Sequence, residues 1–206
     1  MTQLLPGTFG TLLRYWQGGR DLELIFESVH LRISAIGERV ARLRIAPEGK
    51  FAPRRSWDVV PADDDFPIPA VALREDGQSI RFEMGAFQVI YQRGGGLCFE
   101  FTEQRFFRLE ELPAAQPGGP LALRLPVEPG EHFYGFGERS GLLEKSGSRM
   151  INWATDPNHM HGPDVEAMYI AIPFALALRP GLAWGLFFHN TFHSEFDLTQ
   201  PGELSV

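Results

Sequence analysis

Cysteine is almost absent from this 206-residue sequence, which contains only Cys98. A single cysteine excludes an intrachain disulfide and any CxxC metal site. Within the apolar run Leu97–Phe101, Cys98 is expected to pack as a small buried residue. Lysine is nearly as scarce, since Lys50 and Lys145 are the only lysines among 19 basic residues. The net charge of −7 and the scattered arginines argue against a nucleic-acid partner, because phosphate binding needs clustered Lys and Arg.

Long apolar runs are also missing. No stretch approaches the roughly 18 apolar residues that a membrane helix needs, so we expect no membrane partner. The segment Met1–Gly7 lacks a basic region followed by an apolar core, so it does not resemble a signal peptide. We therefore expect a cytoplasmic protein. With 44% hydrophobic and 22% charged residues, the composition is ordinary for a globular domain.

No stretch shows a convincing stripe of apolar residues at helical spacing. In addition, 22 glycines and 16 prolines interrupt the chain too often for long helices. Apolar and polar residues instead alternate with a period of two, which is typical of antiparallel sheets with one face on a core. The alternation is clear at residues 29–35, 80–84, 87–91, 97–101, 121–125, 170–178 and 182–189. The triplet Gly94–Gly96 between two such runs predicts a hairpin. We predict an all-β antiparallel sandwich with roughly a dozen or more strands.

Three stretches have no such alternation, namely residues 61–69, 113–120 and 139–167. The first contains the run Asp63–Asp65, which we interpret as a solvated acidic loop rather than a cation site. The third is the longest. Loops of that length in a compact domain are usually functional or disordered, so we expect residues 139–167 to carry function.

Four motifs occur in order in the last third of the chain. They are EHFYGFGER (Glu131–Arg139), NWATDP (Asn152–Pro157), YIAIPF (Tyr169–Phe174) and WGLFFHNT (Trp184–Thr191). Together they resemble the motifs (F/Y)YGxGE, NTD or WxxD, Yxx(I/V)P(F/Y) and a G(L/V)(F/L)x(D/H)N strand of family 31 glycoside hydrolases. The upstream residues fit that family only loosely, so the resemblance depends mainly on residues 131–191.

This resemblance implies a galactose-mutarotase-like β-supersandwich in which residues 1–206 form a single N-terminal domain. In the family, this domain packs on a (β/α)8 barrel that contributes both carboxyl groups of the retaining mechanism. The acidic segments of that barrel do not occur in this chain, so we expect no catalytic residue, cofactor or metal here and no hydrolysis by the chain alone. The implied function is the non-catalytic domain of an α-glucosidase-type enzyme. Its implied partners are an α-glucoside or related saccharide and the barrel, and the isolated domain could dimerise through its barrel-facing surface.

Asp156 and Trp153 are the candidate substrate-binding residues. At the matching loop position, family members have an aspartate that hydrogen-bonds sugar hydroxyls. A carboxylate can accept from two adjacent hydroxyls, and an indole offers an apolar face to a pyranose ring. The alternative is that Asp156-Pro157 is only a turn, because aspartate often bonds its own backbone there.

Two further features of the 139–167 loop have simple interpretations. His159 and His161 with Asp164 include suitable metal ligands, but two histidines and one carboxylate without cysteine favour a solvated loop tip. Glu138 and Arg139 are expected to pair locally at the base of the loop.

Two other functions stay open from the residues alone. A free-standing aldose mutarotase would need a histidine acid and a glutamate base in a groove. The candidates for these roles are His132, His189, His193, Glu138 and Glu195. A stand-alone carbohydrate-binding module is the other alternative.

Overall fold

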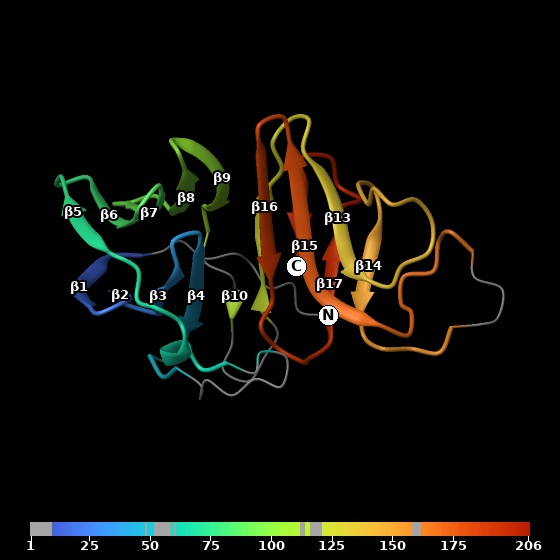
Figure 1. The fold of residues 1–206 in the computed structure, drawn as a ribbon, viewed down its shortest axis with the longest axis horizontal. Helices are drawn as coiled ribbons and strands as arrows, with labels where there is room; N and C mark the ends of the chain where they lie inside the picture. The colour runs from blue at the N-terminus through green and yellow to red at the C-terminus, as the bar shows by residue number, and fades with distance from the viewer. Residues whose placement is uncertain are drawn as a thin grey trace. The chain divides into compact units, whose positions relative to one another are not determined.

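The computed structural model describes residues 10–47, 49–51, 59, 61–111, 114–115, 121–157 and 162–206 (Figure 1). Within these residues every strand pairing is antiparallel, and the one helical element is the 3₁₀ turn η1 (Asp63–Asp65). The predicted all-β antiparallel class is confirmed. None of the described residues form a helix long and apolar enough to cross a membrane. The chain divides into two compact units, residues 1–55 with 59–123 and residues 56–58 with 124–206.

The first unit contains two larger sheets and one short strand pair. In spatial order, the first sheet consists of β1 (Leu12–Gly18), β2 (Asp21–Phe26), β3 (His30–Gly37) and β4 (Val40–Ala46). The second consists of β5 (Ala72–Glu75), β6 (Ser79–Met84), β7 (Phe87–Gln92), β8 (Leu97–Phe101) and β9 (Gln104–Leu109). The short pair is β10 (Ala114–Ala115) with β11 (Leu121–Ala122).

The core of the first unit follows from the alternation in its strands. Every second side chain of β2 and β6 is buried, because successive residues of a strand point to opposite faces. The two sheets meet where the ring of Phe26 lies edge-on to Tyr91 at 5.3 Å between centroids. The hairpin predicted at Gly94–Gly96 is confirmed, since Tyr91 on β7 lies opposite Leu97 on β8.

The acidic run of the first unit differs from the prediction. Asp63 is buried and its carboxylate pairs with the Arg42 guanidinium at 2.5 Å, so a fully solvated loop is wrong for this residue. Asp64 and Asp65 are exposed, and the Asp65 carboxylate accepts the Ala62 backbone N–H at 2.7 Å. The run is a turn anchored by one buried ion pair, which its Pro-rich surroundings did not reveal.

The second unit contains two sheets. In spatial order, one consists of β12 (Arg124–Pro126), β18 (Glu203–Ser205), β17 (Ser194–Asp197) and β14 (Arg149–Asn152). The other consists of β13 (His132–Gly137), β15 (Ala171–Arg179) and β16 (Leu182–Phe187).

The core of the second unit lies between these sheets, where the rings of Phe136 and Phe188 both meet Phe196 edge-on. The alternating run predicted at residues 121–125 is split at Leu123 into β11 and β12. β11 pairs within the first unit and β12 within the second. The chain therefore passes from one unit to the other inside a run that looks continuous in the sequence.

Candidate functional site

The glycines of the GFG segment create a bulge at the end of β13. The pairing of β13 with β15 shifts register between Gly135 and Gly137, and both glycines have positive φ, 100° and 81°. A Cβ on Gly135 would lie 2.7 Å from the Phe174 carbonyl oxygen, and one on Gly137 would lie 2.7 Å from the Ile172 nitrogen. Only glycine tolerates both the close approach and the backbone conformation. The bulge ends the pairing and redirects the chain into the following loop.

Phe136 sits between these glycines with φ 66°, which is rare for a bulky residue. Its ring is fully buried and lies 5.0 Å from the Phe196 ring. The core contact therefore compensates for the backbone strain. At the other end of the same strand, buried Glu131 accepts the Trp184 indole N–H at 2.7 Å. These motif residues hold the position of β13.

Arg139 follows the bulge and lies at the base of the long loop. Its guanidinium donates to the Asn152 side-chain oxygen at 2.7 Å and to the Glu166 backbone carbonyl at 3.3 Å. Burial lowers the pKa of Arg139. The predicted local pair with Glu138 is wrong, because Arg139 contacts the start and the return of the loop instead. The Glu138 backbone N–H donates to the Ile170 carbonyl at 2.9 Å.

Lys145 organises the adjacent segment 138–148. Its side chain is only 6% exposed, and its ammonium donates to the backbone carbonyls of Ser140, at 2.7 Å, and Leu142. Its backbone N–H donates to the Phe133 carbonyl at 2.8 Å. Burial, followed by the positive charge of Arg139, lowers the pKa of Lys145. One of the two lysines in the chain is therefore a structural cation.

We call residues 151–169 the arm, with residues 151–157 as its outgoing limb and 162–169 as its returning limb. Its outgoing and returning limbs run beside each other at the base, where the Ile151 N–H donates to the Glu166 carbonyl at 2.8 Å. The Thr155 N–H also donates to the Met168 carbonyl at 3.0 Å. The limbs are thus joined by two backbone hydrogen bonds, and the Arg139 side chain adds donors to Asn152 and to the Glu166 carbonyl. The predicted loop-tip residues His159 and His161 lie outside the described residues.

Trp153 and Asp156, the two predicted site residues, both lie exposed on the outgoing limb of the arm. The Trp153 side chain is 54% exposed, and its ring lies 6.0 Å from the His193 ring at an interplanar angle of 42°. The Thr155 hydroxyl donates to the Trp153 carbonyl at 3.0 Å. The Asp156 carboxylate lies near the Tyr169 phenol. The structure therefore exposes an indole and a carboxylate on the same limb of the arm.

Tyr169, near Asp156, and His193, beside Trp153, are two neighbours to which the sequence assigned no substrate-binding role. Desolvation, followed by the proximity of Asp156, raises the pKa of Tyr169. Tyr169 begins the YIAIPF motif, which indicated a strand, whereas it lies just before β15. His193 was a candidate only for mutarotase chemistry. Its pairing with Trp153 depends on the loop between β16 and β17, so no local signal pointed to it.

Among the five mutarotase candidates, the contact between a histidine and a glutamate that is seen, His193 with Glu195, lies at an exposed site. His132 Nδ1 lies 3.8 Å from a Glu144 carboxylate oxygen at the start of β13. His193 Nε2 lies 4.0 Å from a Glu195 oxygen beside the arm. Both contacts are at exposed sites, and neither includes Glu138.

Metal ligation has no support in the described part of the chain. No group of three or more potential ligands gathers there. Asp164, the carboxylate considered with the two loop-tip histidines, is exposed on the returning limb of the arm.

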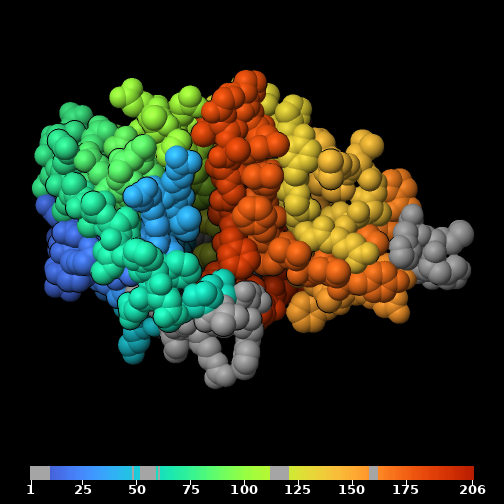
Figure 2. Space-filling model, viewed as in Figure 1, coloured from blue at the N-terminus to red at the C-terminus, as the bar shows by residue number. Residues whose placement is uncertain are grey.

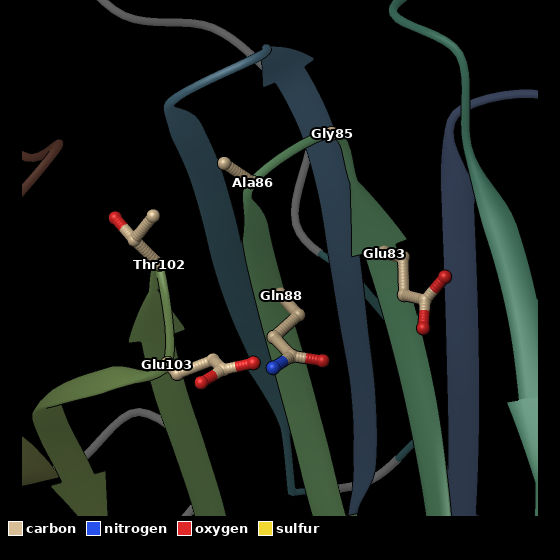
Figure 3. A pocket seen from close by; sticks show the side chains of 6 residues that line it. All are labelled: Glu83, Gly85, Ala86, Gln88, Thr102 and Glu103. Carbon is tan, nitrogen blue, oxygen red and sulfur yellow. The ribbon is translucent and has the colours of Figure 1, made fainter.

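A concave pocket of about 410 Å³ lies in the first unit, not at the arm. Figure 3 shows its lining side chains on β6, on β7 and in the turn after β8. Of the lining residues, Gln88 donates its side-chain amide to the Glu100 carboxylate at 3.0 Å, and the Glu83 carboxylate pairs with the Arg74 guanidinium at 3.0 Å. These residues pair with one another across the solvent face of the sheet, and no predicted site residue lines the pocket.

Solved structures with the same fold include enzymes named as GH31 glycosidases. The chain superposes on a GH31 dextranase of Flavobacterium johnsoniae, solved with isomaltotriose, with a TM-score of 0.83 at 19% identity. The match covers 96% of this chain and 25% of the dextranase. A GH31 α-xylosidase from a soil metagenome, solved with xylose, matches with a TM-score of 0.72 at 19% identity over 94% of this chain and 30% of its own. The fold is therefore that of a β-sheet domain found within glycoside hydrolases.

The family model for the glycosyl hydrolase 31 N-terminal galactose mutarotase-like domain matches residues 30–197. The chain belongs to this family, and the predicted galactose-mutarotase-like fold is confirmed. Over 71 residues, it is also 41% identical to α-glucosidase 2 of Bacillus thermoamyloliquefaciens. That match covers 34% of this chain and 9% of the α-glucosidase. The chain thus spans a minor part of the enzymes it resembles.

Proposed function

We propose that this chain is the N-terminal, non-catalytic domain of a retaining α-glucosidase-type glycoside hydrolase. The family match over residues 30–197 carries this proposal. The local identity to an α-glucosidase supports the substrate class. In this proposal residues 1–206 act as one domain, and a barrel elsewhere in the polypeptide supplies the nucleophile and the acid/base. The chain alone hydrolyses nothing.

The function of the domain is to present the arm to the sugar pocket of that barrel. Asp156 would accept hydrogen bonds from two neighbouring sugar hydroxyls, and Trp153 would cover an apolar ring face. Exposure of both side chains on one limb supports this role. The backbone bonds at the base of the arm and the donors of Arg139 would keep the limb in place when a saccharide binds.

An apolar sheet face supports docking to the barrel. One face of β15 and β16 carries exposed large side chains, Ile172 and Phe174 on β15 and Phe187 on β16. In Figure 2 the segment of β15 and β16, coloured orange to red, lies open at the surface. Clustered exposed apolar side chains on a globular domain usually mark an interface. We propose that the barrel covers this face, and that the isolated chain dimerises through it. Sedimentation of the isolated chain as a monomer at all concentrations would count against this surface.

Replacement of Asp156 tests the proposed role of the arm. In the complete polypeptide, Asp156→Ala should lower kcat/KM for p-nitrophenyl α-glucoside by roughly 1–3 kcal/mol, or about 5- to 150-fold, because a charged hydrogen bond is lost. The thermal unfolding midpoint should not change, since the carboxylate is exposed. Asp164→Ala, an exposed aspartate on the returning limb, is the matched control. Equal kinetics for both variants would remove Asp156 from the site.

The mutarotase alternative has a direct test. Anomer exchange of glucose or galactose can be followed by NMR in the presence of the isolated chain. Clear catalysis would overturn the proposed accessory role, and exchange at the uncatalysed rate is expected.

A further inference from the structure

Trp16 lies on β1 in the first unit and points away from the core of that unit. Its partner in the strand pairing is Glu23 on β2, which in turn lies opposite Arg32 on β3. Residues that lie opposite each other in a sheet point to the same side, so these three side chains share one face. Leu22 and Leu24, which flank Glu23, are buried in the core. The face of Trp16 is therefore the outer face of the sheet, and its side chain is 55% exposed.

The indole of Trp16 folds down over Gly18 on its own strand. A Cβ on Gly18 would overlap the Cζ2 and Cη2 atoms of the ring. Gly18 is not among the glycines with positive φ, so its backbone conformation would accept alanine and only the ring requires glycine. One exposed tryptophan is ordinary on a protein surface. A glycine that makes room for its ring gives the indole one side supported by the strand and one side open to solvent.

Two charged side chains beside the indole have hydrogen-bonding capacity to spare. The Glu23 carboxylate receives the Arg32 guanidinium at 2.7 Å from Nε and 2.5 Å from Nη2, and both contacts are to Oε1. The Glu23 side chain makes no other hydrogen bond with the described residues, so Oε2 can accept from a ligand. Arg14, two positions before Trp16 and thus on the same face, is exposed and makes no ion pair within the described residues.

The strand that carries the indole is anchored from its other face. β1 ends the first sheet and β5 ends the second. The Tyr15 hydroxyl donates to the Glu75 carboxylate on β5 at 2.6 Å, and the Arg93 guanidinium donates to the same carboxylate. This clasp joins the two edge strands and fixes the position of Trp16 before any ligand arrives, which lowers the cost of ordering on binding.

We propose that Trp16, Arg14 and Glu23 form a binding platform for one glucose ring of an α-glucan chain. The open indole side packs against the apolar face of the pyranose, and the guanidinium and carboxylate donate to and accept from its hydroxyls. The choice of an α-glucan rests on the proposed function, in which the complete polypeptide cleaves α-glucosides. The platform itself belongs to the first unit and uses neither Asp156 nor Trp153 of the arm.

Replacement of Trp16 separates this platform from the sugar pocket. In the complete polypeptide, Trp16→Ala should raise KM for soluble starch by roughly 2- to 10-fold, as for the loss of one aromatic contact. The kinetics with p-nitrophenyl α-glucoside should not change, because a single glucose ring in the pocket does not reach the platform. Val40→Ala is the matched control, since Val40 is 56% exposed on the opposite edge strand of the same sheet. It should leave both substrates unaffected.

Native electrophoresis through a gel that contains soluble starch measures binding without catalysis. Starch should retard Trp16→Ala less than the unmodified polypeptide, with a roughly 2- to 10-fold higher dissociation constant. Unchanged retardation would overturn the platform. Equal losses on starch and on p-nitrophenyl α-glucoside would overturn it as well, because Trp16 would then act on the pocket. Failure of the proposed function is seen separately, as normal kinetics for Asp156→Ala.

Gly18→Ala tests whether the indole must lie on the strand. This variant keeps Trp16 but displaces its ring, so retardation by starch should weaken as in Trp16→Ala. Gly37→Ala is the control, because a Cβ on Gly37 meets no atom within 4 Å and its φ is not positive. Retardation should be normal in Gly37→Ala. Normal retardation in Gly18→Ala would show that binding does not use the ring as it lies over Gly18, and would overturn the inference.

Discussion

Phe136 offers a quantitative test of how the GFG bulge is held. Its ring is fully buried against Phe196, and its backbone has φ 66°. Truncating a buried phenylalanine to alanine typically costs about 3–5 kcal/mol. Alanine keeps a Cβ and so retains the left-handed strain of about 1–2 kcal/mol, whereas glycine relieves it. Both variants lose the same ring.

The two truncations should therefore rank in an unusual order. We expect Phe136→Gly to be more stable than Phe136→Ala by about 1 kcal/mol, because the relief of strain exceeds the extra chain entropy of glycine. Urea unfolding followed by circular dichroism would measure both free energies, provided that the m-values agree.

Phe133 is the internal control for this ranking. It lies on the same strand, its side chain is 1% exposed, and it is not among the residues with positive φ. At this position glycine should be the less stable variant by about 0.5–1 kcal/mol, as in ordinary strands. If glycine is also the worse residue at position 136, the strain argument is refuted and the φ of Phe136 has no energetic consequence.

Two more predictions concern buried polar groups. Arg139→Met should leave the Asn152 oxygen and the Glu166 carbonyl without these donors. The amides of Ile151 and Thr155 should then exchange hydrogen faster, because the free energy of local opening falls by about 1–3 kcal/mol. Unchanged exchange rates would show that the Arg139 hydrogen bonds do not hold the two limbs together. Burial raises the pKa of the Cys98 thiol to about 11, so a disulfide reagent near neutral pH should label it only after denaturation. Because the unfolded thiol ionises first, the unfolding free energy should fall between about pH 9 and 11, and this extra fall should vanish in Cys98→Ala.

Local alternation predicted most of the strands, because it reports which face of each strand is buried. The runs at 80–84, 87–91 and 97–101 became β6, β7 and β8 with the expected hairpin. Alternation could not divide the strands between sheets, since partners are chosen by contacts distant in the sequence. The break at Leu123 has this origin, because the two halves of that run pair in different units. The burial of Asp63 likewise depends on Arg42, 21 positions away.

The site could be predicted only as far as its motifs extend. The NWATDP motif pointed to Trp153 and Asp156, and both lie exposed on one limb. Their neighbours come from other segments, Tyr169 from the returning limb and His193 from the loop after β16. The role of Arg139 was missed for the same reason. Its acceptors lie 13 and 27 positions further along the chain, so the adjacent Glu138 was the obvious but wrong partner.

Buried cations explain how an irregular arm can be held without a ladder of strand hydrogen bonds. Backbone carbonyls in loops need donors when they are removed from water. Lys145 donates to two such carbonyls and Arg139 to one, so positive side chains replace the N–H groups of an adjacent strand. Desolvation of both cations is unfavourable, as their lowered pKa values indicate. These two cations bear this cost around the arm's base, where rigidity matters if Asp156 must meet a saccharide in a fixed orientation.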